Sequence, residues 1–467
     1  MSFLPYVPFA HALVAKQDLP IPAWLFAWAA SIVLIVSFFA LSAAWRKPKF
    51  EDERWRPAAG WLPTALLSPA LQVLCGALGV FLLGVAAYSG IHGTEAPDRN
   101  FAITFLFVTA WLGFPFFSAF LGDIFRFFNP WRAIGRVAGG GFRLIAGQRA
   151  AHLRYPDRLG RWPAAVGLLA FVWLEVVYGS SGGVSVGLDP HAAGVAALVY
   201  SAYTLAMMAL FGVEEWCRRG ETFAVFFGMF AQLAPFGVRD GRIGRRRPLA
   251  AATHWATVPG SAAVVLASIA TTSFDGAQDG ALKAAIQNTM EAAEKIGLSP
   301  LDALRWTDTA YLLVTFAGVA IIYALGVRGM RSVPGAPPYK TLFRGFAHTL
   351  IPIALAYLVA HYFSLFVYQE QAQFTYLLSD PLGTATTDLF GTAEAGIDFK
   401  LLSPNLIWYV QVASLVAGHV LGLTLAHDRA LVYWKDYRRA SRSQYWMLAV
   451  MVAFTCFGLY LLSVGNG

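Results

Sequence analysis

Long apolar runs, separated by short polar segments, are the main pattern along this chain. A helix needs about 20 mostly apolar residues to cross a bilayer, and ten runs approach or exceed that length. A membrane barrel would instead show short alternating segments, so helices are the expected spanning elements. Pro352 lies one turn into the run 346–368 and predicts a kink there. The ten predicted spans are residues 23–45, 64–89, 101–121, 162–180, 191–213, 257–274, 306–327, 346–368, 404–426 and 444–464.

An eleventh apolar segment, Phe223–Phe236, is too short to cross and contains Pro235 near its end. We interpret it as re-entrant. The predicted fold is therefore an all-α, polytopic membrane helix bundle of about ten transmembrane helices plus one re-entrant segment. Residues 23–467 are expected to form a single transmembrane domain, and residues 1–22 an outer N-terminal arm. The first ten residues lack the basic start and the long apolar core of a signal peptide.

The basic residues test this topology. With the N-terminus outside, 29 of the 35 lysines and arginines fall in inner segments and six in outer ones. Lysine and arginine accumulate on the cytoplasmic side of membrane proteins. The distribution therefore predicts a multi-pass membrane protein with both termini outside.

Composition narrows the function classes. The chain is 57% hydrophobic and 13% charged, and its net charge of +8 follows from the topology rather than from nucleic-acid binding. The expected partners are the lipid bilayer and a small-molecule substrate, with a membrane partner subunit left open. Cys75, Cys217 and Cys456 form no CxxC pattern, which argues against thiolate metal sites and c-type haem.

Two apolar runs near the C-terminal end of the chain contain histidines, His361 and His419. An ionisable side chain inside a span is costly and is a functional candidate by default. His361 lies about seven residues below the outer end of its span, or roughly 10 Å at 1.5 Å per residue. Glu175 and Gln411 lie at a similar depth on other spans, and Asp275 marks the outer end of 257–274.

The outer segments bring further polar residues to this level. Imidazole and carboxylate together suit zinc, copper or iron, and an incompletely coordinated metal can activate water. We therefore expect a divalent metal, zinc or copper, with Glu175 or Asp275 as a further ligand or as the general base. The candidate metal ligands are His11, Asp18 and His361, and the outer residues Asp380 and Asp388 can approach the same level.

Each candidate also has a structural interpretation. Glu175 and His361 could serve only as hydrogen-bond partners between helices, and Asp380 and Asp388 could cap turns of a glycine-rich loop. His419 lies nearer the inner face. A haem with two histidine ligands is disfavoured, because His361 and His419 differ in depth by roughly 12 Å.

Several long motifs point to a family. They are HALVAKQDLPIPAWLF, GDIFRFFNPWR, RRGETFAVFFG followed by APF, TTSFDG, HTLIPIALAYLVAHYFSLF with SDPLG, DLFGTA, and WYVQVASLVAGHVLGLTLAHDRAL. Over about His11 to Leu431 the chain resembles bacterial integral-membrane proteins named fenitrothion hydrolase. The resemblance implies hydrolysis of phosphotriester-like compounds and carries over no catalytic residue. Many members have a signal peptide ending just before the position of His11, and its removal would expose a histidine able to chelate copper. Only ten residues precede His11 here, which departs from that pattern.

The leading expectation is thus a metal-dependent hydrolase at the outer face, with His361 and carboxylates holding the metal. Two other classes stay open. In a proton- or ion-coupled transporter, Glu175 and His361 would form a relay and Phe223–Phe236 a gate. A metal-handling or assembly protein would bind the metal without turnover.

Overall fold

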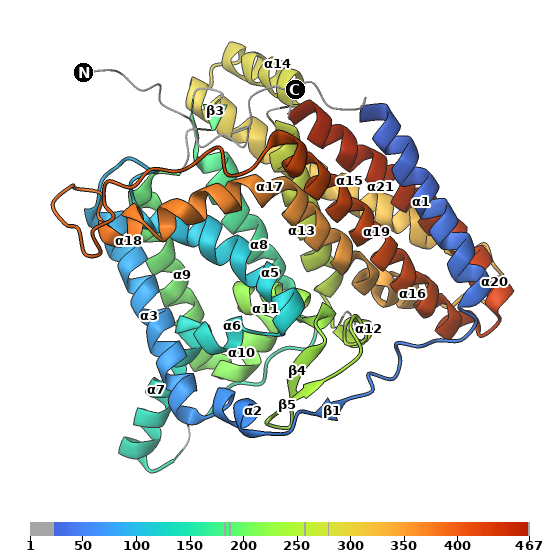
Figure 1. The fold of residues 1–467 in the computed structure, drawn as a ribbon, viewed down its shortest axis with the longest axis horizontal. Helices are drawn as coiled ribbons and strands as arrows, with labels where there is room; N and C mark the ends of the chain where they lie inside the picture. Colours follow the sequence, from blue (N-terminus) through green and yellow to red (C-terminus); the bar gives the residue numbers. More distant parts are fainter. Residues whose placement is uncertain are drawn as a thin grey trace.

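The computed structural model describes residues 23–148, 150–181, 184–185, 188–255, 258–278 and 280–465. His11 and Asp18, and with them the expected outer arm, lie outside these ranges. The described chain forms a bundle of long helices, with small helices and a short sheet gathered at one end (Figure 1).

Eight helical segments of the described residues are long and apolar enough to cross a membrane. The expectation of a helical membrane bundle is therefore confirmed, whereas the count of ten is not. The eight candidate spans are Leu25–Ala44, Pro69–His92, Phe101–Leu121, Pro190–Phe211, Pro300–Met330, Tyr339–Ser379, Pro404–Trp434 and Tyr437–Leu461.

These spans contain the following elements. They are α1 (Ala23–Ala44), α3 (Pro69–His92), α4 (Phe101–Thr104), the π-helical turn η1 (Phe105–Ala110), α5 (Trp111–Leu121), α9 (Pro190–Phe211), α15 (Pro300–Met330), α16 (Tyr339–Phe346), the 3₁₀ turn η4 (Ala347–Leu350), α17 (Ile351–Gln373), α18 (Tyr376–Ser379), α19 (Pro404–Trp434), α20 (Tyr437–Ser443) and α21 (Tyr445–Gly465).

Two of the ten predicted spans correspond to helices outside this set. The run 162–180 forms α8 (Trp162–Trp173) and the π-helical turn η2 (Leu174–Tyr178), which is apolar but shorter. The run 257–274 forms α13 (Ser261–Gln278), in which every residue except Gly276 is buried. Because α13 faces protein on all sides, its serines and threonines are not exposed to lipid, and hydropathy alone underestimates such a helix.

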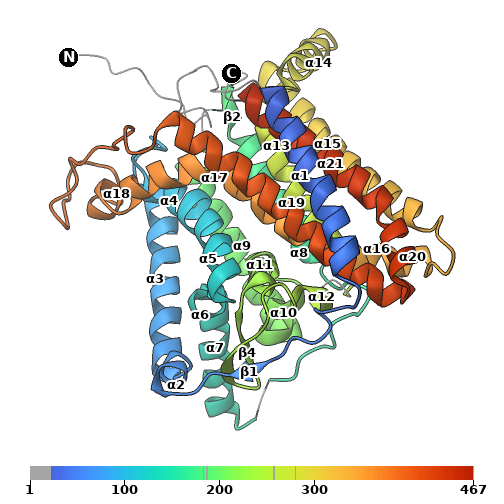
Figure 2. The same ribbon diagram turned by 45° about the vertical axis from the view of Figure 1, so that its right-hand side comes forward.

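Helix α13 is the centre of the bundle. It packs against α8, α15, α17 and α21, so segments far apart in sequence meet along its length (Figure 2). Any polar side chain that α13 carries is therefore presented to several helices at once.

Glycines set the closest helix contact, between α17 and α19. A Cβ added at Gly418 would lie 2.3 Å from Ala356 Cβ, and one added at Gly422 would lie 2.8 Å from the Thr349 carbonyl oxygen. The four-residue spacing puts both glycines on one face of α19, a recurrent arrangement between membrane helices. This close approach fixes the position of α17, which carries His361.

Pro352 occupies the first turn of α17, directly after η4. There its missing N–H has no intrahelical partner to lose, so the proline is tolerated. The sequence predicted a helix beginning near residue 346 with a kink at Pro352. Instead, α16 ends at Phe346, and the helix changes type in η4, before Pro352.

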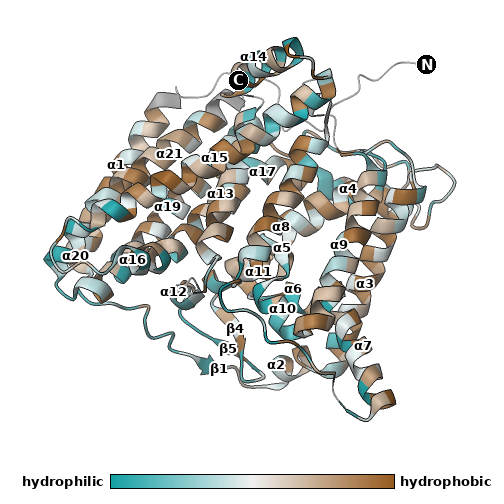
Figure 3. Ribbon diagram, turned by 180° about the vertical axis from the view of Figure 1, so that it is seen from behind, coloured by the Kyte–Doolittle hydropathy of each residue, from teal (hydrophilic) through white to brown (hydrophobic). Residues whose placement is uncertain are grey.

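Polar segments lie at both ends of the brown, apolar spans of Figure 3, with α14 (Lys283–Lys295) at the upper end and the strands at the lower end. A three-stranded antiparallel sheet there has the order β1-β5-β4, from Arg56–Pro57, Arg242–Arg245 and Phe236–Arg239. The remaining elements are α2 (Trp61–Leu66), α6 (Phe125–Phe128), α7 (Pro130–Ala146), β2 (Ser180–Ser181), β3 (Val184–Ser185), α10 (Val213–Arg219), α11 (Thr222–Phe230), the 3₁₀ turn η3 (Ala231–Leu233) and α12 (Ala252–Trp255).

Both ends of α11 approach one short connecting segment. Asn129 Nδ2 donates a 3.0 Å hydrogen bond to Glu221, just before α11. After η3, the Phe236 carbonyl oxygen lies 2.9 Å from where a Cβ of Gly122 would stand. Gly122 has φ +95°, which favours glycine, and it ends α5.

Candidate functional site

Asp275 and His361 meet between the central helix α13 and α17. The Nε2 atom of His361 lies 3.0 Å from Asp275 Oδ2, and the two side chains are 14% and 2% exposed. Since the carboxylate accepts, Nε2 carries the proton and Nδ1 holds the lone pair in the neutral ring. A carboxylate that orients an imidazole in this way is typical of catalytic and metal-binding histidines.

Two further donors hold the Asp275 carboxylate. Tyr362, the neighbour of His361, donates its hydroxyl to Oδ2 at 2.5 Å. Gln278 Nε2, one helical turn further along α13, donates to Oδ1 at 3.1 Å. A buried carboxylate with three donors is well satisfied, so its position is fixed.

Gly276 makes room for the imidazole. A Cβ at this position would lie 3.3 Å from both Nδ1 and Cε1 of His361. The Asp-Gly pair of the TTSFDG motif therefore provides both the hydrogen-bond acceptor and the space for the ring.

Glu175 lies in the π-helical turn η2, and its Oε2 atom is buried. π-Helical turns in helices are frequent at functional sites. Helix α8, which continues into η2, packs against α13, the helix that carries Asp275. Glu175 and Asp275 therefore lie on neighbouring elements of the bundle.

One acid at this end of the bundle was missed. Asp308 is 3% exposed on α15, which packs against α13. Next to it, Thr309 Oγ1 accepts a 2.8 Å hydrogen bond from Trp173 Nε1 on α8. Asp308 is only the third residue of the predicted span 306–327. An acid so close to the end of a span is ordinarily exposed, so its position gave no sign of burial.

The other candidates have different surroundings. Gln411 is 4% exposed on α19. His419 is fully buried, and its Nδ1 donates to the Leu415 carbonyl oxygen of its own helix at 2.8 Å. Asp380 accepts hydrogen bonds from Ala385 and Thr387, and Asp388 accepts from the backbone of Thr392 and Ala393, so both carboxylates cap turns of the outer loop.

The fit to a metal can be tested on these donors. No group of three or more His, Cys, Asp or Glu that could hold a metal ion occurs among the described residues. The oxygens of Asp275 already accept hydrogen bonds from His361, Tyr362 and Gln278. This carboxylate therefore orients His361 rather than binding a metal. His361 Nδ1 is thus the atom of the Asp275–His361 pair that a metal could use, and a single nitrogen does not make a site.

A second buried carboxylate, Glu221, was not recognised from the sequence. It caps α11 through the backbone N–H groups of Phe223 and Ala224, and it accepts from Tyr200 at 2.6 Å and from Asn129 at 3.0 Å. Burial raises the pKa of the Glu221 carboxyl, and these hydrogen bonds oppose that rise. An acid directly before an apolar helix is an N-cap signal that could have identified it.

The histidine at the end of α19 belongs to a structural contact. Asp428 is fully buried and accepts from Trp45 Nε1 and from the backbone of Lys49 and Phe50, while His427 bonds the Trp45 carbonyl oxygen. These bonds fasten the segment after α1 to the end of α19.

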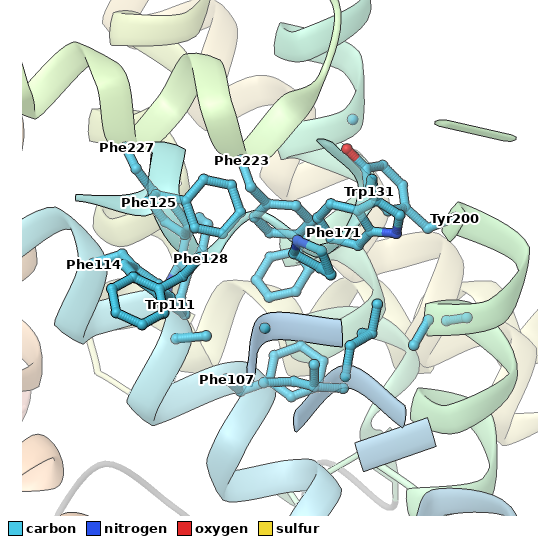
Figure 4. A pocket seen from close by; sticks show the side chains of 18 of the residues that line it. Phe107, Trp111, Phe114, Phe125, Phe128, Trp131, Phe171, Tyr200, Phe223 and Phe227 are labelled. Carbon is cyan, nitrogen blue, oxygen red and sulfur yellow. The ribbon is translucent and has the colours of Figure 1, made fainter. Parts of the chain in front are cut away.

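A large apolar groove lies apart from the Asp275–His361 pair. Its volume is about 1340 Å³, and its walls come mainly from α3, η1, α5, α6, α7, α8, α9, α11 and α17. Figure 4 shows the aromatic part of the wall, in which Trp131 stacks on Phe223 and Phe107 stacks on Phe171. The ring centroids of these two pairs are 5.7 Å and 4.9 Å apart.

Comparison with protein-family models, with curated proteins and with solved structures finds no match for this chain.

Proposed function

We propose that this protein is a membrane-embedded hydrolase in which His361 is the general base and Asp275 orients it. The observation that carries the proposal is the 3.0 Å contact between His361 Nε2 and Asp275 Oδ2, both on buried parts of the bundle. The resemblance of the motifs to fenitrothion hydrolase supplies the substrate class, a phosphotriester-like compound.

In the proposed reaction, a water oxygen forms a bond to phosphorus while Nδ1 of His361 takes one of its protons. The phosphorus–oxygen bond to the leaving group breaks, and that oxygen departs with the electron pair. Asp275 stabilises the imidazolium, which then gives the proton to the leaving oxygen. No step is assigned to a metal, because the Asp275–His361 pair offers one suitable ligand.

The test uses purified protein in detergent and an aryl phosphotriester that releases a coloured phenol. His361→Asn and Asp275→Asn should each lower kcat by about 10²- to 10⁴-fold, the usual contribution of general-base catalysis. His191→Asn, at an exposed position of α9, is the matched control and should keep wild-type activity.

Metal content is measured on the same samples, and turnover is assayed with and without added Zn²⁺ or Cu²⁺. Folded wild-type protein without turnover in every condition would overturn the proposal. Metal binding without turnover would instead support the metal-handling alternative. Full activity of His361→Asn would also exclude His361 as the base.

We further propose the topology expected from the charges, in a bacterial inner membrane. In this arrangement α8 with η2 and α13 cross along with the eight candidate spans, which makes ten, and both termini lie outside. Support for a non-crossing α11 comes from its two ends, which approach Asn129 and Gly122 of one connecting segment.

A proton- or ion-coupled transporter is the second candidate, favoured by the polar side chains of α13. Ser268 and Ser273 on this buried helix have hydroxyls with no hydrogen-bond partner among the described residues, as has Nε2 of His419. Buried polar atoms of this kind could pass ions or protons inward from His361. Proton uptake by reconstituted vesicles that His361→Asn abolishes, without phosphotriester turnover, would favour this candidate.

A further inference from the structure

The groove beside α9 is larger than a site for a small polar substrate. Its volume of about 1340 Å³ exceeds the roughly 300–1000 Å³ usual for small-molecule pockets. Its walls are almost entirely aliphatic and aromatic side chains. Such a groove suits a molecule with a long apolar body.

The groove follows most of the bilayer depth. Ala193 and Phe211, near the two ends of α9, both line it. They are about 27 Å apart at 1.5 Å per residue, close to the roughly 30 Å of a hydrocarbon core. Four of the surrounding segments, α3, η1 with α5, α9 and α17, belong to candidate membrane spans. An occupant would therefore come from the bilayer, and an extended acyl chain fits along the groove.

One carboxyl interrupts the apolar wall. Phe366 and Glu370 line the groove from one face of α17, and Phe374 lines it directly after that helix ends at Gln373. The Glu370 Oε1 atom is buried, and the Thr109 hydroxyl beside it is its one side-chain donor among the described residues. A buried carboxylate whose oxygens have a single neutral donor is still costly. A donor carried by the occupant would remove that cost.

Two other polar groups of the wall already have partners, since Tyr200 donates its hydroxyl to Glu221 and Trp131 donates its indole N–H to Ser201. Glu370 is the one acidic or basic side chain among the residues that line the groove. The charge of the groove is therefore set by Glu370, which is complementary to a cation and opposed to an anion.

We infer that this groove binds a bilayer lipid with a primary-ammonium head group, of the phosphatidylethanolamine type. The ammonium donates to Glu370, and the acyl chains lie against the aromatic wall of Trp131, Phe171 and Phe223. The inference is independent of the proposed hydrolysis, because Asp275 and His361 do not line the groove.

The test measures lipids that stay bound through purification in mild detergent, by native mass spectrometry. The protein is prepared from vesicles containing equal amounts of phosphatidylethanolamine and phosphatidylglycerol. Wild-type protein should retain the ethanolamine lipid about tenfold over the glycerol lipid, as a charge-assisted hydrogen bond predicts. Glu370→Gln should retain both lipids about equally.

A matched pair of variants on α9 tests the place of binding. Ala196 lines the groove, whereas Ala202 is exposed on the same helix and does not. Ala196→Trp should lose bound lipid, and Ala202→Trp should behave as wild type. The inference is overturned if wild-type protein retains no lipid, if it does not distinguish the two lipids, or if Glu370→Gln keeps the preference. Because the readout is lipid content, it is separate from any result on phosphotriester turnover.

Discussion

The His361 imidazole and the Asp275 carboxylate are 86 positions apart in sequence, and their Nε2 and Oδ2 atoms are 3.0 Å apart. The contact joins the most buried helix of the bundle to a helix held in place by the glycines of α19. The geometry of the pair therefore depends on packing remote from it. This dependence allows functional and structural effects to be separated by mutation.

Removing the Tyr362 hydroxyl should test the support of Asp275. Tyr362→Phe leaves the buried carboxylate with one donor fewer, so we expect a loss of unfolding free energy of about 1–2 kcal/mol. Turnover should fall less than in Asp275→Asn, because His361 keeps its acceptor. Thermal unfolding and the phosphotriester assay measure the two effects. Tyr409→Phe, at an exposed position of α19, is the control, and equal stability of both variants would contradict the prediction.

The α17–α19 contact predicts a specific rescue. Gly418→Ala places a methyl group 2.3 Å from Ala356 Cβ, and such overpacking should destabilise the protein by about 1–3 kcal/mol. Adding Ala356→Gly removes that clash and should restore part of the loss. Gly84→Ala is a suitable control, since nothing lies within 4 Å of its added Cβ. Stability is measured by thermal unfolding in detergent, and additive effects of the two substitutions would refute direct contact.

Much of the fold could be predicted from sequence because lipid imposes long apolar runs. The runs at 257–274 and 162–180 show the limit, since α13 and α8 with η2 pack mostly against other helices. The depth of each residue in the membrane could also be predicted, because the rise per residue of a helix is constant. These depths predicted that Glu175, Asp275 and His361 lie at one end of the bundle.

The direction in which each side chain points around its helix axis could not be predicted in the same way. The depth of His361 left Glu175, Asp275, Gln411 and the outer segments as alternative partners, and helix packing brings Asp275 into hydrogen-bond contact with it. The hydrogen bonds of Asp428 could not be predicted from the sequence either, because they join α19 to a loop nearly 380 positions away.

That contact gives the next prediction. Asp428→Asn replaces one acceptor oxygen with an amide and leaves at least one backbone N–H of Lys49 or Phe50 without its acceptor. We expect a loss of about 1–3 kcal/mol and faster trypsin cleavage after Arg46 and Lys49. Asp52→Asn, at an exposed position of the same segment, should change neither. Unchanged cleavage in Asp428→Asn would show that the segment is held by other contacts.

Glu221 predicts a pH dependence of stability. Burial raises the pKa of its carboxyl, so the folded protein favours the protonated form. The associated stability is present below the ordinary pKa of 4.5 and is lost as pH rises through the higher folded value. Across about pH 4 to 8, the Tm of wild-type protein should therefore fall relative to that of Glu221→Gln. Glu291→Gln on α14 is the control, and a wild-type Tm that instead rises relative to Glu221→Gln would mean that the hydrogen bonds outweigh burial.

The topology can be tested at the two flanks of α11. Arg218 and Arg242 are exposed, on α10 and β5, and we expect both on the inner side because α11 does not cross. Cys75, Cys217 and Cys456 are free thiols and are replaced first, since Cys217 adjoins Arg218. Single Arg218→Cys and Arg242→Cys variants should then resist a membrane-impermeant maleimide in intact cells and react after lysis. Lys283→Cys on α14 should react without lysis, because that helix lies on the expected outer side. Labelling of Arg218→Cys and Arg242→Cys from opposite sides would mean that α11 crosses and would reverse every later span.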